Sequence, residues 1–231
     1  MRTTSKLLKS LAVLSALLPF CTSGLASIVY DNTDPNNDLN RTYGPNNVQF
    51  GNQITLAGTD RVITDFQFEY FLSGNANGNE TLQLQLLNND GPLTTVTLAN
   101  STQTQVHAPG SVFYTSPVTS QPLSTGFAHT DVYAISVPAP DTFTWVVKAT
   151  GIDPGEVFGL RVNNPPTTGS AFSDFWQNNN GTWNAYLFSD PSGPATFAAR
   201  VTAVPEPTTF ACALLAGLSW IAFLGYKRRC S

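Results

Sequence analysis

The chain has 231 residues, a formal net charge of −4 at pH 7 and only 11% charged residues. Between Ser27 and Ala203 it carries 14 acidic residues against 5 basic ones, a net charge of −9 that disfavours nucleic acid as a partner. Cys21, Cys212 and Cys230 all lie outside this segment, which excludes a disulfide framework and thiol chemistry within it. A segment of about 177 residues is long enough to fold around a hydrophobic core, alone or with a bound metal.

The first 26 residues have the layout of a secretory signal peptide. Three basic residues precede an apolar run from Leu11 to Cys21, and the region ends in small residues at Ala26. A signal peptidase cleaves after small residues of this kind. We therefore predict export across the inner membrane, cleavage between Ala26 and Ser27, and a mature chain that begins at Ser27.

An acidic, asparagine-rich segment opens the mature chain. Asp31, Asp34 and Asp38 place three carboxylates within eight residues, and such hard oxygen ligands suit calcium. Pro35 and the missing glycine break the pattern of a helix-loop-helix calcium site, so a polar turn before the first strands is the simpler interpretation. Calcium binding is a hypothesis, and we predict no cofactor.

Apolar residues then alternate with polar ones, which is typical of half-buried β-strands. The alternation is clear in Asp65–Tyr70, in Leu82, Leu84 and Leu86, in Phe143–Lys148 and in Phe158–Val162. Further strand-like runs lie at Ile28–Tyr30, Val48–Leu56, Leu93–Leu98, Val132–Val137, Ala171–Trp176, Thr182–Phe188 and Ala195–Val201. Asn180 followed by Gly181 predicts a tight hairpin turn.

The segment 27–203 is therefore predicted to be all-β, with roughly ten to twelve strands in a two-layer antiparallel β-sandwich of jelly-roll type. The stretch Val106–Pro122 has three prolines and little alternation, so it is predicted to be a long connection. His107 and His129 stand alone, outside any recognisable catalytic motif. We predict that the protein is not an enzyme.

Aromatic residues gather near the end of this segment. Six of them between Phe172 and Phe188 flank a polar turn of asparagine and glutamine. A ring can cover the C–H face of a sugar while amides bind its hydroxyl groups, so Trp176, Trp183 and Tyr186 are the candidate ligand-binding residues. The alternative is a core hairpin in which Trp176 and Trp183 pair across strands and lie beneath the second sheet.

The last 28 residues, 204–231, form a segment of their own. Val204, Pro205, Glu206 and Pro207 precede an apolar run at 208–226, and Lys227, Arg228 and Arg229 follow it. At about 1.5 Å per residue this run makes a helix of roughly 28 Å, which is long enough to span a bilayer. The basic cluster then predicts a cytoplasmic C-terminus, with 27–203 on the opposite side of the membrane.

This order of motif, helix and basic cluster resembles the PEP-CTERM sorting signal of bacterial surface and secreted proteins. The resemblance covers residues 204–231. It implies recognition by an exosortase, a membrane-embedded protease or transpeptidase that removes the helix near the motif. The two prolines keep the motif extended, which suits a processing enzyme. A permanent single-pass anchor behind a stiff linker is the alternative.

Residues 28–203 also resemble the choice-of-anchor group of bacterial exported domains, in Asn46–Gly51 and Phe172–Trp176. That resemblance implies a β-rich architecture without an assigned activity. We expect an exported surface or extracellular-matrix protein with a structural or adhesive role, processed by signal peptidase and exosortase. The alternative function is a carbohydrate-binding module that recognises extracellular polysaccharide.

Overall fold

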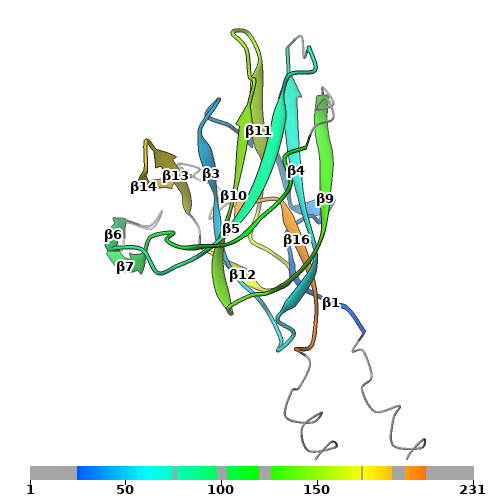
Figure 1. The fold of residues 1–231 in the computed structure, drawn as a ribbon, viewed down its shortest axis with the longest axis vertical. Coiled ribbons are helices and arrows are strands. Elements are labelled where there is room, and N and C mark those ends of the chain that lie inside the picture. Colours follow the sequence, from blue (N-terminus) through cyan, green and yellow to red (C-terminus); the bar gives the residue numbers. More distant parts are fainter. Residues whose placement is uncertain are drawn as a thin grey trace, which may run out of the picture. The chain divides into compact units, whose positions relative to one another are not determined.

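Strands make up most of the described chain (Figure 1). The computed structural model describes residues 25–74, 77–97, 103–119, 126–172, 174–188 and 196–206. The strands are β1 (Ser27–Asp31), β2 (Asp38–Tyr43), β3 (Gln49–Thr55), β4 (Val62–Ser73), β5 (Thr81–Asn88), β6 (Leu93–Thr97), β7 (Gln103–His107), β8 (Val112–Thr115), β9 (Gly126–Pro138), β10 (Thr142–Thr150), β11 (Val157–Asn163), β12 (Ser170–Ala171), β13 (Asp174–Asn179), β14 (Thr182–Leu187), β15 (Thr196–Phe197) and β16 (Ala199–Val204). One short 3-10 helix, η2 (Pro35–Asn37), joins β1 to β2.

The strands form two large sheets and one small one. The β4 sheet has the order β1-β16-β4-β11-β15, with β2 paired to β11 and β9 paired to β4. The β10 sheet has the order β14-β13-β3-β10-β5-β8, with β12 paired to β3. Among the described strands β6 and β7 pair only with each other, and we call them the β6–β7 ribbon. All pairings among these strands are antiparallel, so the all-β, antiparallel prediction is confirmed.

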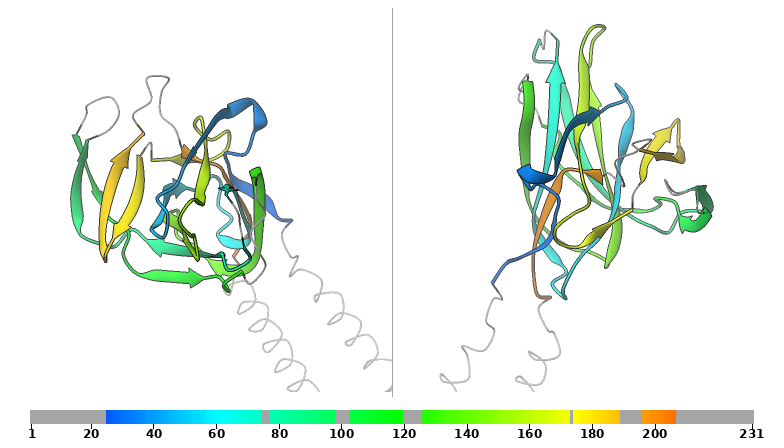
Figure 2. Two further views of the ribbon diagram at one scale, coloured as in Figure 1. Left: turned by 90° about the horizontal axis from the view of Figure 1, so that it is seen from above. Right: turned by 180° about the vertical axis from the view of Figure 1, so that it is seen from behind.

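The two large sheets face each other across one hydrophobic core, as the layers in Figure 2 show. Phe66 and Phe68 of β4 pack against Trp145 of β10, with ring centroids 5.4 and 5.8 Å away from the indole. The predicted alternation in Asp65–Tyr70 is confirmed, because its aromatic side chains are buried in this core. The same holds for Phe143, Trp145 and Val147 of β10 and for Leu82, Leu84 and Leu86 of β5. Val146 is also buried, but it lies on the opposite face of β10.

The predicted hairpin turn at Asn180 and Gly181 is confirmed. Strands β13 and β14 remain paired up to Asn179 and Thr182, so these two residues alone form the loop. Their φ angles are +54° and +91°. Two left-handed residues in a two-residue loop match the twist of the flanking strands, which explains the Asn-Gly pair.

The ends of the domain lie side by side in the β4 sheet. Ser27 of β1 is paired with Ala203 of β16. The compact unit of the structure runs from Ala26 to Val204, one residue beyond each predicted limit. Among the described residues no helix is both long and apolar enough to cross a membrane. The predicted signal sequence up to residue 24 and the predicted helix at 208–226 lie outside the described residues.

Two details of the predicted strand pattern are wrong. The described residues contain sixteen strands, because pieces as short as β12 and β15, with two residues each, show no period in the sequence. The stretch Val106–Pro122 is not one connection, since it contains the end of β7 and all of β8. Strand β8 has only four residues and lies at the edge of the β10 sheet, where a short strand needs little alternation.

Candidate functional site

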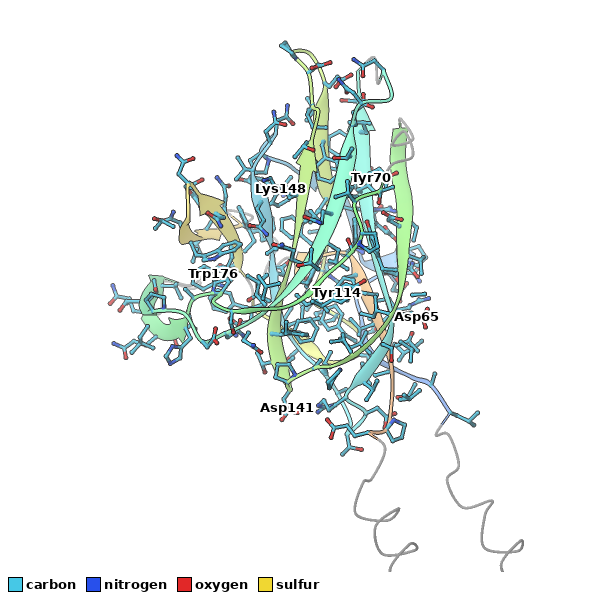
Figure 3. All side chains as sticks on the ribbon, viewed as in Figure 1. Asp65, Tyr70, Tyr114, Asp141, Lys148 and Trp176 are labelled. Carbon is cyan, nitrogen blue, oxygen red and sulfur yellow. The ribbon has the colours of Figure 1, made fainter. Side chains whose placement is uncertain are left out.

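The outer face of the β10 sheet, which points away from the shared core, carries a row of polar side chains. Directly paired residues on antiparallel strands project to the same face. Following the pairings from β5 through β10, β3 and β13 to β14 gives the row Gln83, Lys148, Gln49, Asn178 and Trp183. In Figure 3, Lys148 lies on β10 and Trp176 on β13, the two strands that flank β3.

A cleft with a volume of about 410 Å³ opens along this row. Its lining comes from the start of β3, from β10 and from the β13–β14 turn: Asn47, Val48, Gln49, Lys148, Asn178, Asn179, Asn180 and Gly181. Five of these eight residues carry a carboxamide, one carries a positive charge and none is acidic. We call it the amide cleft.

Hydrogen bonds fix the carboxamides in the middle of the amide cleft. Gln49 Nε2 donates to Gln85 Oε1 at 2.5 Å, and Gln49 Oε1 accepts from Asn178 Nδ2 at 3.3 Å. Asn178 Oδ1 accepts from the backbone N–H of Gly181 at 2.7 Å, which ties the cleft to the hairpin turn. Each carboxamide has four hydrogen-bonding positions, so these bonds leave capacity for a ligand. Groups that are already ordered lose less entropy when a ligand binds.

Two of the three predicted aromatic residues lie next to the amide cleft. Trp183 is half-buried and is paired with Asn178, so its indole lies on the same face as the cleft residues. Tyr186 is 37% exposed and stacks on Phe175, with ring centroids 5.5 Å apart. Its hydroxyl accepts from Asn179 Nδ2 at 2.9 Å. The structure thus brings Trp183 and Tyr186 to opposite sides of the β14 strand beside the cleft.

Trp176 is not available as a ligand platform, because it is fully buried at 0% exposure. It stacks on Phe172, with centroids 6.3 Å apart, and packs against Val96 and Ala108. A sugar would need an exposed ring face, so the predicted binding role of Trp176 is not met in this structure. The alternative prediction is right that Trp176 is buried but wrong about its surroundings. Trp176 is paired with Ala185 rather than with Trp183, and residues at the β6–β7 ribbon cover it instead of the β4 sheet.

The start of β13 contributes a buried carboxyl group to the same outer face. Asp174 is 1% exposed, and its Oδ1 has no hydrogen-bond partner among the described residues. Burial raises the pKa of Asp174 from 3.8 to about 6. The residue is two positions before Trp176 and does not line the amide cleft.

The three predicted calcium ligands have separate partners. Asp31 forms an ion pair with Arg200 at 2.9 Å, and Asp38 accepts from Arg161 Nε at 2.9 Å. Asp34 caps η2 by accepting from a backbone N–H two residues further along. Burial alone would raise the pKa of Asp31, but its hydrogen bonds lower it overall, while the hydrogen bond from Arg161 lowers the pKa of Asp38. Within the described ranges no three His, Cys, Asp or Glu residues gather closely enough to hold a metal ion.

The predicted processing residues lie at the ends of the domain where they are described. Ala26 is exposed directly before β1, and Val204 ends β16. Pro205 and Glu206 follow β16 and are exposed. The other predicted sorting residues, Pro207, Lys227, Arg228 and Arg229, lie outside the described residues.

No family model, curated protein or solved structure matches the chain.

Sequence reasoning located the hairpin turn of the site and missed its other half. Asn47, Gln49 and Lys148 lie far from the hairpin in the sequence and reach it only because β3 pairs with both β10 and β13. Gln49 and Lys148 were visible as polar residues at alternate positions of predicted strands, whereas Asn47 lies just before the predicted strand Val48–Leu56. Which strands lie side by side was not visible in that pattern.

Proposed function

We propose that the protein is an exported adhesive component of the cell surface or extracellular matrix, and that its β10 sheet binds polysaccharide through the amide cleft. The observation that carries this proposal is the lining of the cleft, in which five carboxamides and one lysine surround about 410 Å³ next to Trp183. A cleft of this size can take one or two sugar rings.

The chemistry of the lining fits sugars better than apolar ligands. Sugar hydroxyl groups both donate and accept hydrogen bonds, and a carboxamide offers both functions on one rigid plane. The half-buried indole of Trp183 supplies apolar surface for the C–H groups of a ring. Because Gln49 and Asn178 are already held by neighbouring groups, their orientation does not have to be selected by the ligand.

Export and sorting complete the proposal. The exposed Pro205 and Glu206 support access of an exosortase to the motif, and exposed Ala26 supports access of signal peptidase. In this proposal the helix at 208–226 holds the precursor in the inner membrane until exosortase removes it. Mass spectrometry of the mature protein's C-terminus tests this part. A C-terminus near Pro207 is expected, and recovery of peptides from 208–226 in the mature form contradicts removal of the helix.

We also propose jelly-roll topology for the sandwich. The chain alternates between the sheets as it passes from β3 to β4, from β4 to β5, from β8 to β9, from β9 to β10 and from β10 to β11. Repeated crossing between two antiparallel sheets supports this class over a simple meander.

Binding of the full chain in detergent to immobilised polysaccharides tests the cleft. Trp183→Ala removes the aromatic surface, and Asn180→Gly removes one carboxamide while it keeps the left-handed turn residue. Each change is expected to weaken binding by about three- to tenfold, which corresponds to one hydrogen bond or one ring contact. Asn184→Ala is the matched control, since Asn184 lies on the same hairpin but does not line the cleft.

Two results would contradict the cleft as the binding site. The first is equal binding by the wild type, Trp183→Ala and Asn180→Gly, with melting temperatures showing that all three are folded. The second is a loss with Asn184→Ala as large as the loss with Asn180→Gly. A wild-type chain that binds no polysaccharide would favour a structural role without a discrete site.

A further inference from the structure

We infer that the ligand of the amide cleft is an acidic polysaccharide, and that Lys148 binds its carboxylate group. This inference rests on the proposed function and names the ligand class of the same cleft. Lys148 has different surroundings from the arginines of the domain that form ion pairs.

Most basic side chains of the domain are used to hold the fold. Arg61 pairs with Asp141 at 2.6 Å, and Arg200 pairs with Asp31 at 2.9 Å. Arg161 lies between Asp38 and Glu69, and its distance to Glu69 is 3.1 Å. Arg161 and Arg200 connect neighbouring strands, and Arg61 connects the loop before β4 to the loop before β10, so the charge of all three is already compensated by carboxylates.

Lys148 differs from these arginines. Its side chain is exposed, and it takes part in none of the ion pairs found among the described residues. Its neighbours across the sheet are Gln83 on β5 and Gln49 on β3, which are both neutral. It is the one lysine between Ser27 and Ala203, and it lines the amide cleft. A positive charge that none of the described ion pairs compensates therefore lines a cleft of neutral amides.

This combination is selective for a sugar carboxylate. A carboxylate only accepts hydrogen bonds, and the cleft offers it the ammonium group of Lys148 together with carboxamide N–H groups. Hydrogen bonds between ionised groups are shorter and about twice as strong as neutral ones. The absence of acidic residues from the described lining means that no neighbouring charge opposes the ligand.

The net charge of the domain argues for recognition at short range. With 14 acidic and 5 basic residues between Ser27 and Ala203, the domain as a whole repels a polyanion. At physiological ionic strength charges are screened beyond about 8 Å, so distant carboxylates contribute little to the energy of a bound sugar. Attraction then depends on Lys148 itself, and one substitution is expected to remove it.

Affinity measurements with the full chain in detergent test the inference. The probes are polygalacturonate as a carboxylated polymer, dextran as a neutral polymer and dextran sulfate as a sulfated polymer. The wild type is expected to prefer polygalacturonate. Lys148→Gln is expected to weaken polygalacturonate binding by about tenfold or more, the effect of one charge-assisted hydrogen bond, and to weaken dextran binding by a smaller factor. Lys148→Arg keeps the charge and is expected to stay within about threefold of the wild type.

Arg41→Gln is the matched control, since it removes one positive charge from an exposed position on β2 of the other sheet. It is expected to leave polygalacturonate binding unchanged. Equal affinity of Lys148→Gln and the wild type for polygalacturonate, or a wild-type preference for dextran, would overturn the acidic ligand and leave the proposed function intact. A preference for dextran sulfate would overturn the carboxylate assignment. The proposed function itself would be overturned if the wild type binds none of the three polymers and Trp183→Ala does not change binding to the native polysaccharide.

Discussion

The two faces of the β10 sheet are made by the same strands and have opposite character. On the inner face Phe50, Phe143 and Trp145 join the core shared with the β4 sheet. On the outer face Gln49 and Lys148 line the amide cleft. Each of them is adjacent in the sequence to at least one core residue. Side chains alternate across a strand, so a period of two produces a core and a polar surface at once. The apolar positions of these strands therefore build the core, and the polar positions of the same strands build the cleft.

The outer face is itself divided. At one end Trp176 lies fully buried under residues of the β6–β7 ribbon, and at the other end the amide cleft is open. The small cluster around Trp176 contains few buried residues, whereas the main core contains apolar side chains from both large sheets. The two buried tryptophans of the β10 sheet, Trp145 and Trp176, therefore allow a direct comparison of the two faces.

Replacing each tryptophan by alanine tests the difference between the two faces and gives the largest expected effects. Trp145→Ala opens a cavity among the rings of Phe66, Phe68 and Phe197, and we expect a loss of roughly 4–5 kcal/mol in the free energy of unfolding. Trp176→Ala is expected to cost about 3 kcal/mol or less, because a cluster closed by one small ribbon can collapse or admit water. Urea unfolding followed by circular dichroism measures both values.

A loss for Trp176→Ala equal to or larger than that for Trp145→Ala would contradict the division into a main core and a minor cluster. Trp183→Ala gives a third value, since its side chain is half-buried on the outer face and packs against the cluster around Trp176. Its cost is expected to be smaller than either of the others.

Much of the main core could be predicted from the sequence, and most of the cleft could not. The alternation in Asp65–Tyr70 and in the leucines of β5 identified buried side chains, because one buried face imposes a period of two on a strand. The turn at Asn180 and Gly181 was predicted because it needs left-handed residues. These are local signals that a short stretch of chain contains in full.

The cleft depends on information of another kind. Gln49 and Asn178 are 129 positions apart and meet because β3 and β13 are neighbours in one register. Strand order follows from the packing of the whole domain, and no pattern within β3 or β13 encodes it. The element that buries Trp176 was missed for the same reason, since the β6–β7 ribbon that covers it lies far away in the sequence.

A smaller effect tests whether the covered part of the outer face really excludes water. Asp174 is 1% exposed, its Oδ1 lacks a hydrogen-bond partner in the described part of the chain, and burial raises its pKa from 3.8 to about 6. Because the folded state holds this proton more tightly than the unfolded state, the contribution of Asp174 to stability is fully present below pH 3.8. It is lost as the pH rises towards and through about 6, where the cost of the buried charge becomes complete.

Asp174→Asn removes the titration and keeps the shape of the side chain. The free energy of unfolding of the variant relative to the wild type is expected to rise by on the order of 2 kcal/mol between pH 4 and pH 7. Urea titrations at several pH values measure this difference. If the difference is the same at pH 4 and at pH 7, water reaches the carboxylate. The covered part of the outer face would then be as open as the amide cleft, because a carboxylate that remains hydrated keeps its ordinary pKa.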